Sequence, residues 1–198
     1  MRKNNDSLLK QVYVTQTKGF IDISQKRLFW KEIADELNGV FKIKQTISRD
    51  LELLCLQIPY QGAIIEFTES DAHPLKINCI LKAKQAFEFS VCIEDSFDKF
   101  FKLFGRQDII VGDMVFDKKY LIQGKNHEPI KEIFSITDIK SILLKNNVFS
   151  FTCNYQKKES TINLMSMVSR TIRSKNELFD LFKLFSITID KFKELKFV

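Results

Sequence analysis

The sequence predicts an α+β protein in which an antiparallel sheet packs against helices. Three observations favour this class. Runs with an apolar residue at every second position follow one another with short turns between them, other stretches carry apolar residues at helical spacing, and strands and helices do not alternate strictly. Strict alternation would build a parallel sheet, whereas consecutive strands with short connections favour an antiparallel meander. A long amphipathic helix is expected to end the chain.

Residues 1–23 show only a weak alternation of apolar and polar residues and are expected to form an extended N-terminal arm. A helix is predicted from Ser24 to Asn38, because apolar residues recur at helical spacing and Gly39 follows. We expect Trp30 to anchor the packing of this helix. Residues 24–198 are expected to form a single α+β domain, in which two sub-halves remain an open alternative.

After residue 50 the apolar period changes to two, which predicts four consecutive strands. They are expected at Leu51–Ile58, Ala63–Thr68, Lys76–Lys82 and Phe87–Ile93. A four-residue connection, residues 59–62, and the breaker cluster of residues 70–74 contain the Pro, Gly, Ser and Asp typical of turns.

A phenylalanine-rich helix, capped by Asp95 or Ser96, is predicted next, and Gly105 can close it. Its apolar stripe should be buried against the sheet, and it consists of Phe97, Phe100, Phe101 and Phe104. Gly112 and Asp113 then form a turn, and a strand is expected at Phe116–Gln123.

The last third of the chain predicts two short helices, two strands and the long helix. Pro129 and the Ser135-x-x-Asp138 pattern indicate the two short helices. The strands are expected at Val148–Tyr155 and Thr161–Val168, joined by a polar hairpin tip. The capping box that starts at Ser174 opens the long helix, which carries a broad apolar face.

The net charge of +6 does not indicate a nucleic-acid-binding protein. Acidic and basic residues are interspersed, and the basic clusters, Lys42 with Lys44 and Arg49 or Lys82 with Lys84, are short. We therefore expect no nucleic-acid partner.

The cysteines and the apolar runs indicate a cytoplasmic protein that does not span a membrane. No CxxC pattern is present, so we expect four unpaired, buried thiols in a reducing compartment, Cys55, Cys79, Cys92 and Cys153. The N-terminus lacks the apolar run of a secretory signal. The longest uncharged run, Leu53–Ile65, contains Pro59 and Gly62 and is too short for a membrane-spanning helix.

A loop motif connects the predicted phenylalanine-rich helix to the strand after it. It reads Leu103-Phe104-Gly105-x-Gln107-Asp108-Ile109, then Gly112-Asp113-x-x-Phe116-Asp117-x-x-Tyr120. This string resembles the motif LFGxQDIxxGDxxFDxx(F/Y) of uncharacterised, mostly Bacteroidetes-type proteins, over a similarity from Trp30 to Leu195. More distantly, the chain from Phe116 onward is similar to bacterial domains of unknown function that follow transmembrane helices. The resemblance implies a fold family and brings no established activity.

The same loop holds the candidate functional residues, which are Arg106, Asp108, Asp113, Asp117 and Tyr120. The three carboxylates could hold a divalent metal for a hydrolase. In the alternative that we favour, Asp108 and Asp113 accept hydrogen bonds from turn amides, while Asp117 pairs with Lys118, Lys119 or Arg106. The spacing matches no calcium loop, and no neighbouring histidine completes a metal set.

No catalytic residue or cofactor is expected from the remaining motifs. His73 and His127 lie in no nucleophile–base pattern, and the chain has neither a phosphate-binding loop nor a dinucleotide fingerprint. The sequence therefore predicts a non-catalytic cytoplasmic interaction or scaffold domain with an unidentified protein partner. A metal-dependent hydrolase centred on Asp108–Asp117 is the alternative.

Overall fold

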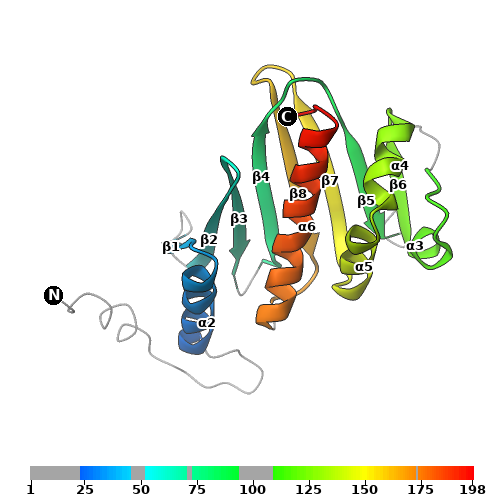
Figure 1. Ribbon diagram of the computed structural model, residues 1–198. Helices are drawn as coiled ribbons and strands as arrows, with labels where there is room; N and C mark the ends of the chain where they lie inside the picture. The colour runs from blue at the N-terminus through cyan, green and yellow to red at the C-terminus, as the bar shows by residue number, and fades with distance from the viewer. Residues whose placement is uncertain (1–22, 46–51, 71–72, 94–108, 173) are drawn as a thin grey trace.

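The computed structural model describes residues 23–45, 52–70, 73–93, 109–172 and 174–198 (Figure 1). Within these ranges, eight strands form one sheet in the order β1-β2-β3-β4-β8-β7-β5-β6, and all neighbours are antiparallel. The strands are β1 (Val40–Gln45), β2 (Glu52–Tyr60), β3 (Ala63–Glu69), β4 (Lys76–Lys82), β5 (Phe89–Ile93), β6 (Tyr120–Gly124), β7 (Val148–Gln156) and β8 (Thr161–Val168). The helices are α2 (Ile23–Glu36), α3 (Met114–Lys119), α4 (His127–Ser135), α5 (Thr137–Lys145) and α6 (Lys175–Glu194). The predicted α+β class, with its antiparallel sheet and long C-terminal helix, is confirmed.

The helices cover one face of the sheet. Figure 1 shows α6 lying along the middle of the sheet, α4 and α5 beside β5 and β6, and α2 near β1 and β2. Lys175 at the start of α6 forms ion pairs with Glu32 at 3.0 Å and Glu36 at 2.6 Å, both on α2. These pairs connect two helices that are far apart in the sequence.

Aromatic rings fill much of the core between the helices and the sheet. Trp30 on α2 is fully buried and stacks on Phe41 of β1. Phe89 of β5 contacts Phe134 of α4 and Phe192 of α6 in edge-to-face geometry. Such pairs are favoured because the positive edge of one ring meets the negative face of the other. The high phenylalanine content therefore serves the packing of helices on the sheet.

A buried ion pair joins α2 to β3. Lys26 Nζ lies 2.5 Å from Glu69 Oε1, and both side chains are almost completely buried. The other oxygen of Glu69 accepts a hydrogen bond of 2.7 Å from the backbone amide of Ile172, just before α6. Removing one partner of such a pair is costly because it leaves a buried charge behind.

A row of side chains that are polar except for Met165 crosses the opposite face of the sheet. Cross-strand pairing aligns the row from β2 to β6 as Gln57, Glu66, Asn78, Met165, Thr152, Ser90 and Gln123. Gln57 donates a hydrogen bond of 2.7 Å to Glu66 within this row. The sheet therefore has one apolar face under the helices and one mixed face, which also exposes Ile64, Ile80 and Met167.

All four cysteines are free, buried thiols, which agrees with the prediction. Burial raises the pKa of Cys79 to about 12. For Cys55, burial and a hydrogen bond to Glu66 together raise the pKa to about 11. These thiols are protonated at neutral pH, so they behave as small apolar side chains.

The predicted strand at Phe116–Gln123 is wrong in its first half. Residues Met114–Lys119 form helix α3, and strand β6 begins only at Tyr120. The Asp113 side chain caps α3 by accepting a hydrogen bond of 3.1 Å from the backbone amide of Phe116. A cap of this kind starts a helix, and six residues are too few to show the helical period.

Two further predictions about local structure are corrected. The connection after β2 is a two-residue turn of Gln61 and Gly62, both with positive φ (47° and 87°), so Pro59 belongs to the strand. Pro59 is tolerated there because β1 pairs with β2 only as far as Gln57, and no neighbour needs its missing amide hydrogen. Ser135 does not cap α5, since Ile136 occupies the cap position.

Strand β1 was not predicted. The expectation that Gly39 closes α2 is also corrected. The left-handed residue after α2 is Asn38 (φ 51°). Gly39 serves close packing instead, because a Cβ there would lie 2.9 Å from the carbonyl oxygen of Gln57.

Several other predictions were confirmed. The two short helices and six predicted strands are present, with strand ends within about two residues of the expected ones. The capping box of α6 is also present, since Ser174 Oγ accepts a hydrogen bond of 3.2 Å from the Glu177 amide. The N-terminal arm up to residue 22 and the helix from Asp95 or Ser96 to Phe104, including its phenylalanines and Gly105, lie outside the described residues.

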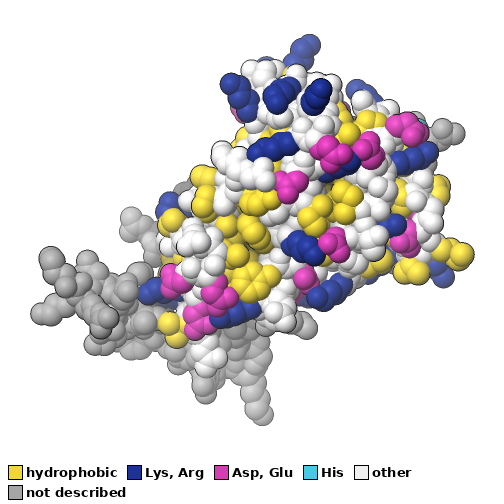
Figure 2. All heavy atoms as spheres, viewed as in Figure 1, with side chains coloured by type: hydrophobic (Ala, Val, Ile, Leu, Met, Phe, Trp, Pro, Cys, Tyr) yellow, Lys and Arg dark blue, Asp and Glu magenta, His cyan; other side chains and the backbone are white. Residues whose placement is uncertain are grey.

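Figure 2 shows the helix-bearing face of the molecule. Acidic and basic side chains are mixed over most of it, and Lys and Arg gather at the end that carries the C-terminus. No helix in the described ranges is both long and apolar enough to span a membrane.

Candidate functional site

The described part of the candidate loop runs from Ile109 to the start of strand β6, at the right of Figure 1. Of the candidate residues, Asp113, Asp117 and Tyr120 are described, whereas Arg106 and Asp108 lie outside the described residues. Ile109 anchors the start of the described loop, since its side chain is buried and its amide donates a hydrogen bond of 2.9 Å to the Ile122 carbonyl.

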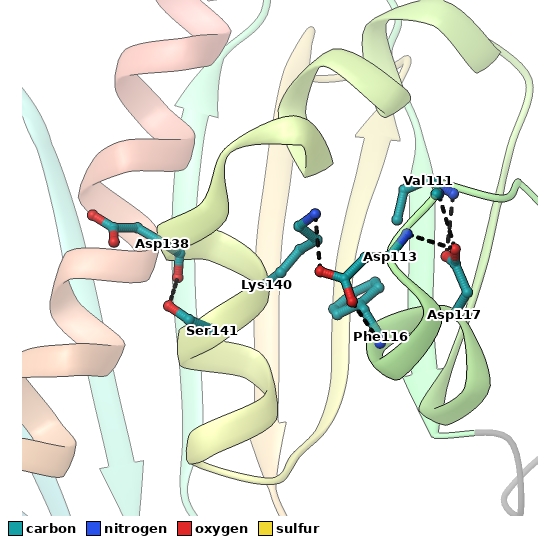
Figure 3. Close-up of polar contacts among 8 residues, drawn as sticks. Val111, Asp113, Phe116, Asp117, Asp138, Lys140 and Ser141 are labelled. Carbon is teal, nitrogen blue, oxygen red and sulfur yellow. Dashed lines mark hydrogen bonds and ion pairs between the residues drawn. The ribbon is translucent and has the colours of Figure 1, made fainter.

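Asp117 holds the loop from inside α3 (Figure 3). Its carboxylate accepts hydrogen bonds from three consecutive backbone amides, those of Val111 at 3.1 Å, Gly112 at 2.9 Å and Asp113 at 3.0 Å. Gly112 has a φ of 81°, a conformation that glycine adopts without strain. A cradle of backbone amides therefore takes the place of the expected pairing with Lys118 or Lys119, while Arg106, the other expected partner, lies outside the described residues.

Asp113 connects the loop to α5. One carboxylate oxygen caps α3 at the Phe116 amide, and the other lies 3.1 Å from Lys140 Nζ, as Figure 3 shows. The hydrogen bond from Phe116 and the neighbouring Lys140 lower the pKa of Asp113. Asp113 is therefore a carboxylate at neutral pH, and it has the two roles of helix cap and ion-pair partner.

Tyr120 anchors the start of β6 in the core. Its ring stacks on Phe116 at a centroid distance of 5.0 Å, and its hydroxyl lies 2.8 Å from the Leu143 carbonyl and 2.9 Å from the Val148 carbonyl. Burial raises the pKa of Tyr120, so the phenol stays protonated and donates to these carbonyls. A buried, protonated tyrosine of this kind connects α5 and β7 to β6.

Three apolar side chains project from the loop that these contacts fix. Ile110, Met114 and Val115 are exposed to 63%, 88% and 67%, and we call them the apolar knuckle. Isolated apolar residues on a surface are ordinary, but three within six residues form a local cluster. Phe116, the next residue in the chain, is fully buried, so α3 divides sharply between a buried and an exposed side.

The loop's carboxylates are engaged by donors of the protein itself. A cation placed at Asp117 would compete with three amides, and one at Asp113 would compete with Lys140. Within the described ranges, no group of three or more His, Cys, Asp or Glu side chains is arranged to hold a metal ion. His73 contacts Ser70, and His127 begins α4, so neither histidine belongs to the loop.

Sequence reasoning missed Lys140 and the knuckle. Lys140 lies on a different helix and no local pattern pairs it with Asp113. Met114 and Val115 lie between the predicted turn and the strand expected from Phe116, and no role was predicted for them. The signal that could have revealed α3 is Asp113 as a cap, with Asp117 in the first helical turn.

Comparison with known proteins finds likeness in fold. No protein-family model matches the chain, and no curated protein matches it in sequence. The crystal structure of the mycobacterial trehalose monomycolate transport factor A, TtfA, is similar, with a TM-score of 0.55 and 7% sequence identity. The similarity covers 87% of this chain and 97% of that chain. At this identity the likeness concerns the fold alone.

Proposed function

We propose that this chain is a non-catalytic interaction domain of the cytoplasm that binds a protein partner through the apolar knuckle. The observation that carries the proposal is how the loop uses its side chains. Its acidic groups hold the backbone and Lys140, while its apolar groups Ile110, Met114 and Val115 face solvent. A site for chemistry would have the opposite arrangement, with convergent polar groups left for a ligand.

The contacts below the knuckle support a docking role because they order it before any partner arrives. Ile109 is buried on one side of the knuckle and Phe116 on the other. The amides between them are held by Asp117. An interface that is already ordered loses less conformational entropy on binding, so a small apolar surface can contribute more of its burial to affinity.

A further observation supports the cytoplasmic part of the proposal. The four buried, free thiols suit a reducing compartment.

Site-specific photo-crosslinking in cells tests the proposal. A photoreactive amino acid at position 114 should give discrete adducts with a protein, because Met114 is the most exposed member of the knuckle. The same probe at Lys76, an exposed residue of β4, is the matched control. We expect Val115→Asp to abolish the adducts at position 114 without changing the melting temperature.

The proposal fails if positions 76 and 114 give the same adducts, or if Val115→Asp leaves those at 114 unchanged. The hydrolase alternative would gain support if the purified protein bound a divalent metal through Asp113 or Asp117.

A further inference from the structure

One end of the molecule carries a lysine cluster that is assembled from three segments. We call it the lysine end, and it comprises six exposed side chains, Lys82, Lys84, Lys157, Lys158, Lys193 and Lys196. Two lie at or just after the end of β4, two in the turn between β7 and β8, and two at the end of α6 or just beyond it. Figure 2 shows the resulting concentration of dark blue side chains at the top of the molecule.

Hydrogen bonds hold these segments together, so the cluster is part of the fold. Ala83 donates to the Ser160 carbonyl at 2.9 Å, which joins the end of β4 to the β7–β8 turn. Lys84 donates through its backbone amide to the Phe197 carbonyl at 2.8 Å, which joins the same segment to the chain after α6. The lysines are thus neighbours in space although they span more than half of the sequence.

Acidic side chains neutralise little of this charge. In the three segments the acidic side chains are those of Glu159 and Glu194, and Lys84 Nζ donates a hydrogen bond of 2.8 Å to the Val198 backbone oxygen. Glu194 already lies 2.7 Å from Lys191, a seventh lysine, which also contacts Glu132 at 2.6 Å. Lys193 donates to the side chain of Gln61, a neutral group that leaves the lysine's charge uncompensated. The lysine end therefore presents a net positive surface.

We propose that the lysine end binds the anionic surface of a phospholipid membrane. The charges come from ammonium groups on long stems at the tips of three elements, and they spread over an end of the molecule. Lysine-rich surfaces of this kind are attracted to anionic lipid without specific geometry. Among the described residues, Arg27 and Arg170 form ion pairs away from the lysine end, so the charge of this end comes from lysines.

A nucleic acid fits this end less well. Binding to single strands or to bases uses exposed aromatic rings or arginine planes as stacking platforms. The aromatic rings beneath the lysine end, Phe87, Phe192 and Phe197, are buried and pack on one another. The proposal is independent of the knuckle, which lies in a different part of the fold, and either can fail without the other.

Vesicle sedimentation tests the proposal with the full-length protein. Vesicles of phosphatidylglycerol and phosphatidylcholine in equal amounts should bind the protein, and vesicles of phosphatidylcholine alone should not. Since each lysine near an anionic surface changes the partition coefficient by about fivefold, Lys157→Gln with Lys158→Gln should lower it by roughly 10- to 30-fold. Raising the salt concentration should release the protein.

The control pair, Lys76→Gln with Lys118→Gln, removes the same charge from exposed sites on β4 and α3. Lys76 begins the strand that Lys82 ends, so it is distant from the lysine end. We expect near wild-type partitioning for this pair, and unchanged melting temperatures for both double variants.

Three results would overturn the proposal. The first is equal binding to neutral and anionic vesicles, or no binding to either. The second is an equal loss for both double variants, which would indicate an effect of net charge alone. The third is preferential binding to a DNA or RNA duplex in competition with anionic vesicles, which would assign the lysine end to nucleic acid.

Discussion

Replacing Asp117 with alanine should destabilise the protein by removing the acceptor of three backbone hydrogen bonds. The bonds measure 2.9 to 3.1 Å, and hydrogen bonds to charged groups contribute about 1.5 to 3 kcal/mol each when buried. Asp117 is half-buried and Gly112 is exposed, so water can replace part of the loss, and we use about 1 kcal/mol per bond. Alanine regains up to about 0.7 kcal/mol in helix propensity. The net cost is therefore roughly 2 to 3 kcal/mol.

Thermal and urea unfolding of purified variants measure this cost. For a protein of 198 residues, 2 to 3 kcal/mol corresponds to a decrease in melting temperature of about 4 to 12 °C. Asp117→Asn keeps one acceptor oxygen and should show roughly half of the loss. Lys118→Ala, at the next and exposed position of α3, is the matched control and should change stability by less than about 0.5 kcal/mol. If Asp117→Ala had the same melting temperature as Lys118→Ala, the role of the Asp117 carboxylate in holding the loop would be refuted.

Three further predictions concern the same region and the core. Tyr120→Phe should cost about 1 to 2 kcal/mol in urea unfolding, because the Leu143 and Val148 carbonyls lose their buried donor; stability equal to wild type would contradict this. Because the pKa of Asp113 is lowered in the folded protein, its carboxylate stabilises the fold above about pH 4, and this stabilisation is lost as the pH falls through the pKa of the folded state. The melting temperature of Asp113→Asn should therefore lie closer to that of the wild type in acid than at neutral pH. A difference that grows in acid would contradict this prediction. Because burial raises thiol pKa values, as for Cys79, a thiol reagent at neutral pH should modify all four cysteines only after unfolding, and rapid modification of the folded protein would show that they are accessible.

Elements with many residues and a regular apolar period could be predicted from the sequence. Strands β3, β4 and β8 alternate between more and less buried residues, and α6 combines a long apolar face with the Ser174 cap. In these segments local preference and burial favour the same structure, which is why single-sequence reasoning succeeds.

Short elements could not be predicted in the same way. Strand β1 has the sequence VFKIKQ, and its lysines were interpreted as a basic cluster although they alternate with Phe41 and Ile43. Helix α3 has only six residues, and its formation depends on the Asp113 cap and on the amides that contact Asp117. The deciding interactions are individual hydrogen bonds, which leave no period in the sequence.

Contacts between distant segments were also beyond sequence reasoning. Lys140 pairs with Asp113 from another helix, and the lysine end joins three segments that the sequence shows only as short, separate clusters. Lys82 with Lys84 was one of those clusters, and the fold places it beside the β7–β8 turn and the chain after α6. The order of strands brings these segments together, and that order depends on the pairing of β4 with β8.

Melting the wild type with and without added magnesium, manganese or calcium tests most directly whether the loop is a structural support or a metal centre. Our proposal predicts that added metal changes the melting temperature of each protein by no more than about 1 °C, for the wild type, for Asp113→Asn and for Asp117→Asn, since the carboxylates already have protein donors. A metal at 100 times its dissociation constant would add about 2.7 kcal/mol, or roughly 5 to 11 °C. A gain of that size in the wild type that is lost in both variants would contradict the non-catalytic proposal and favour a metal-dependent hydrolase.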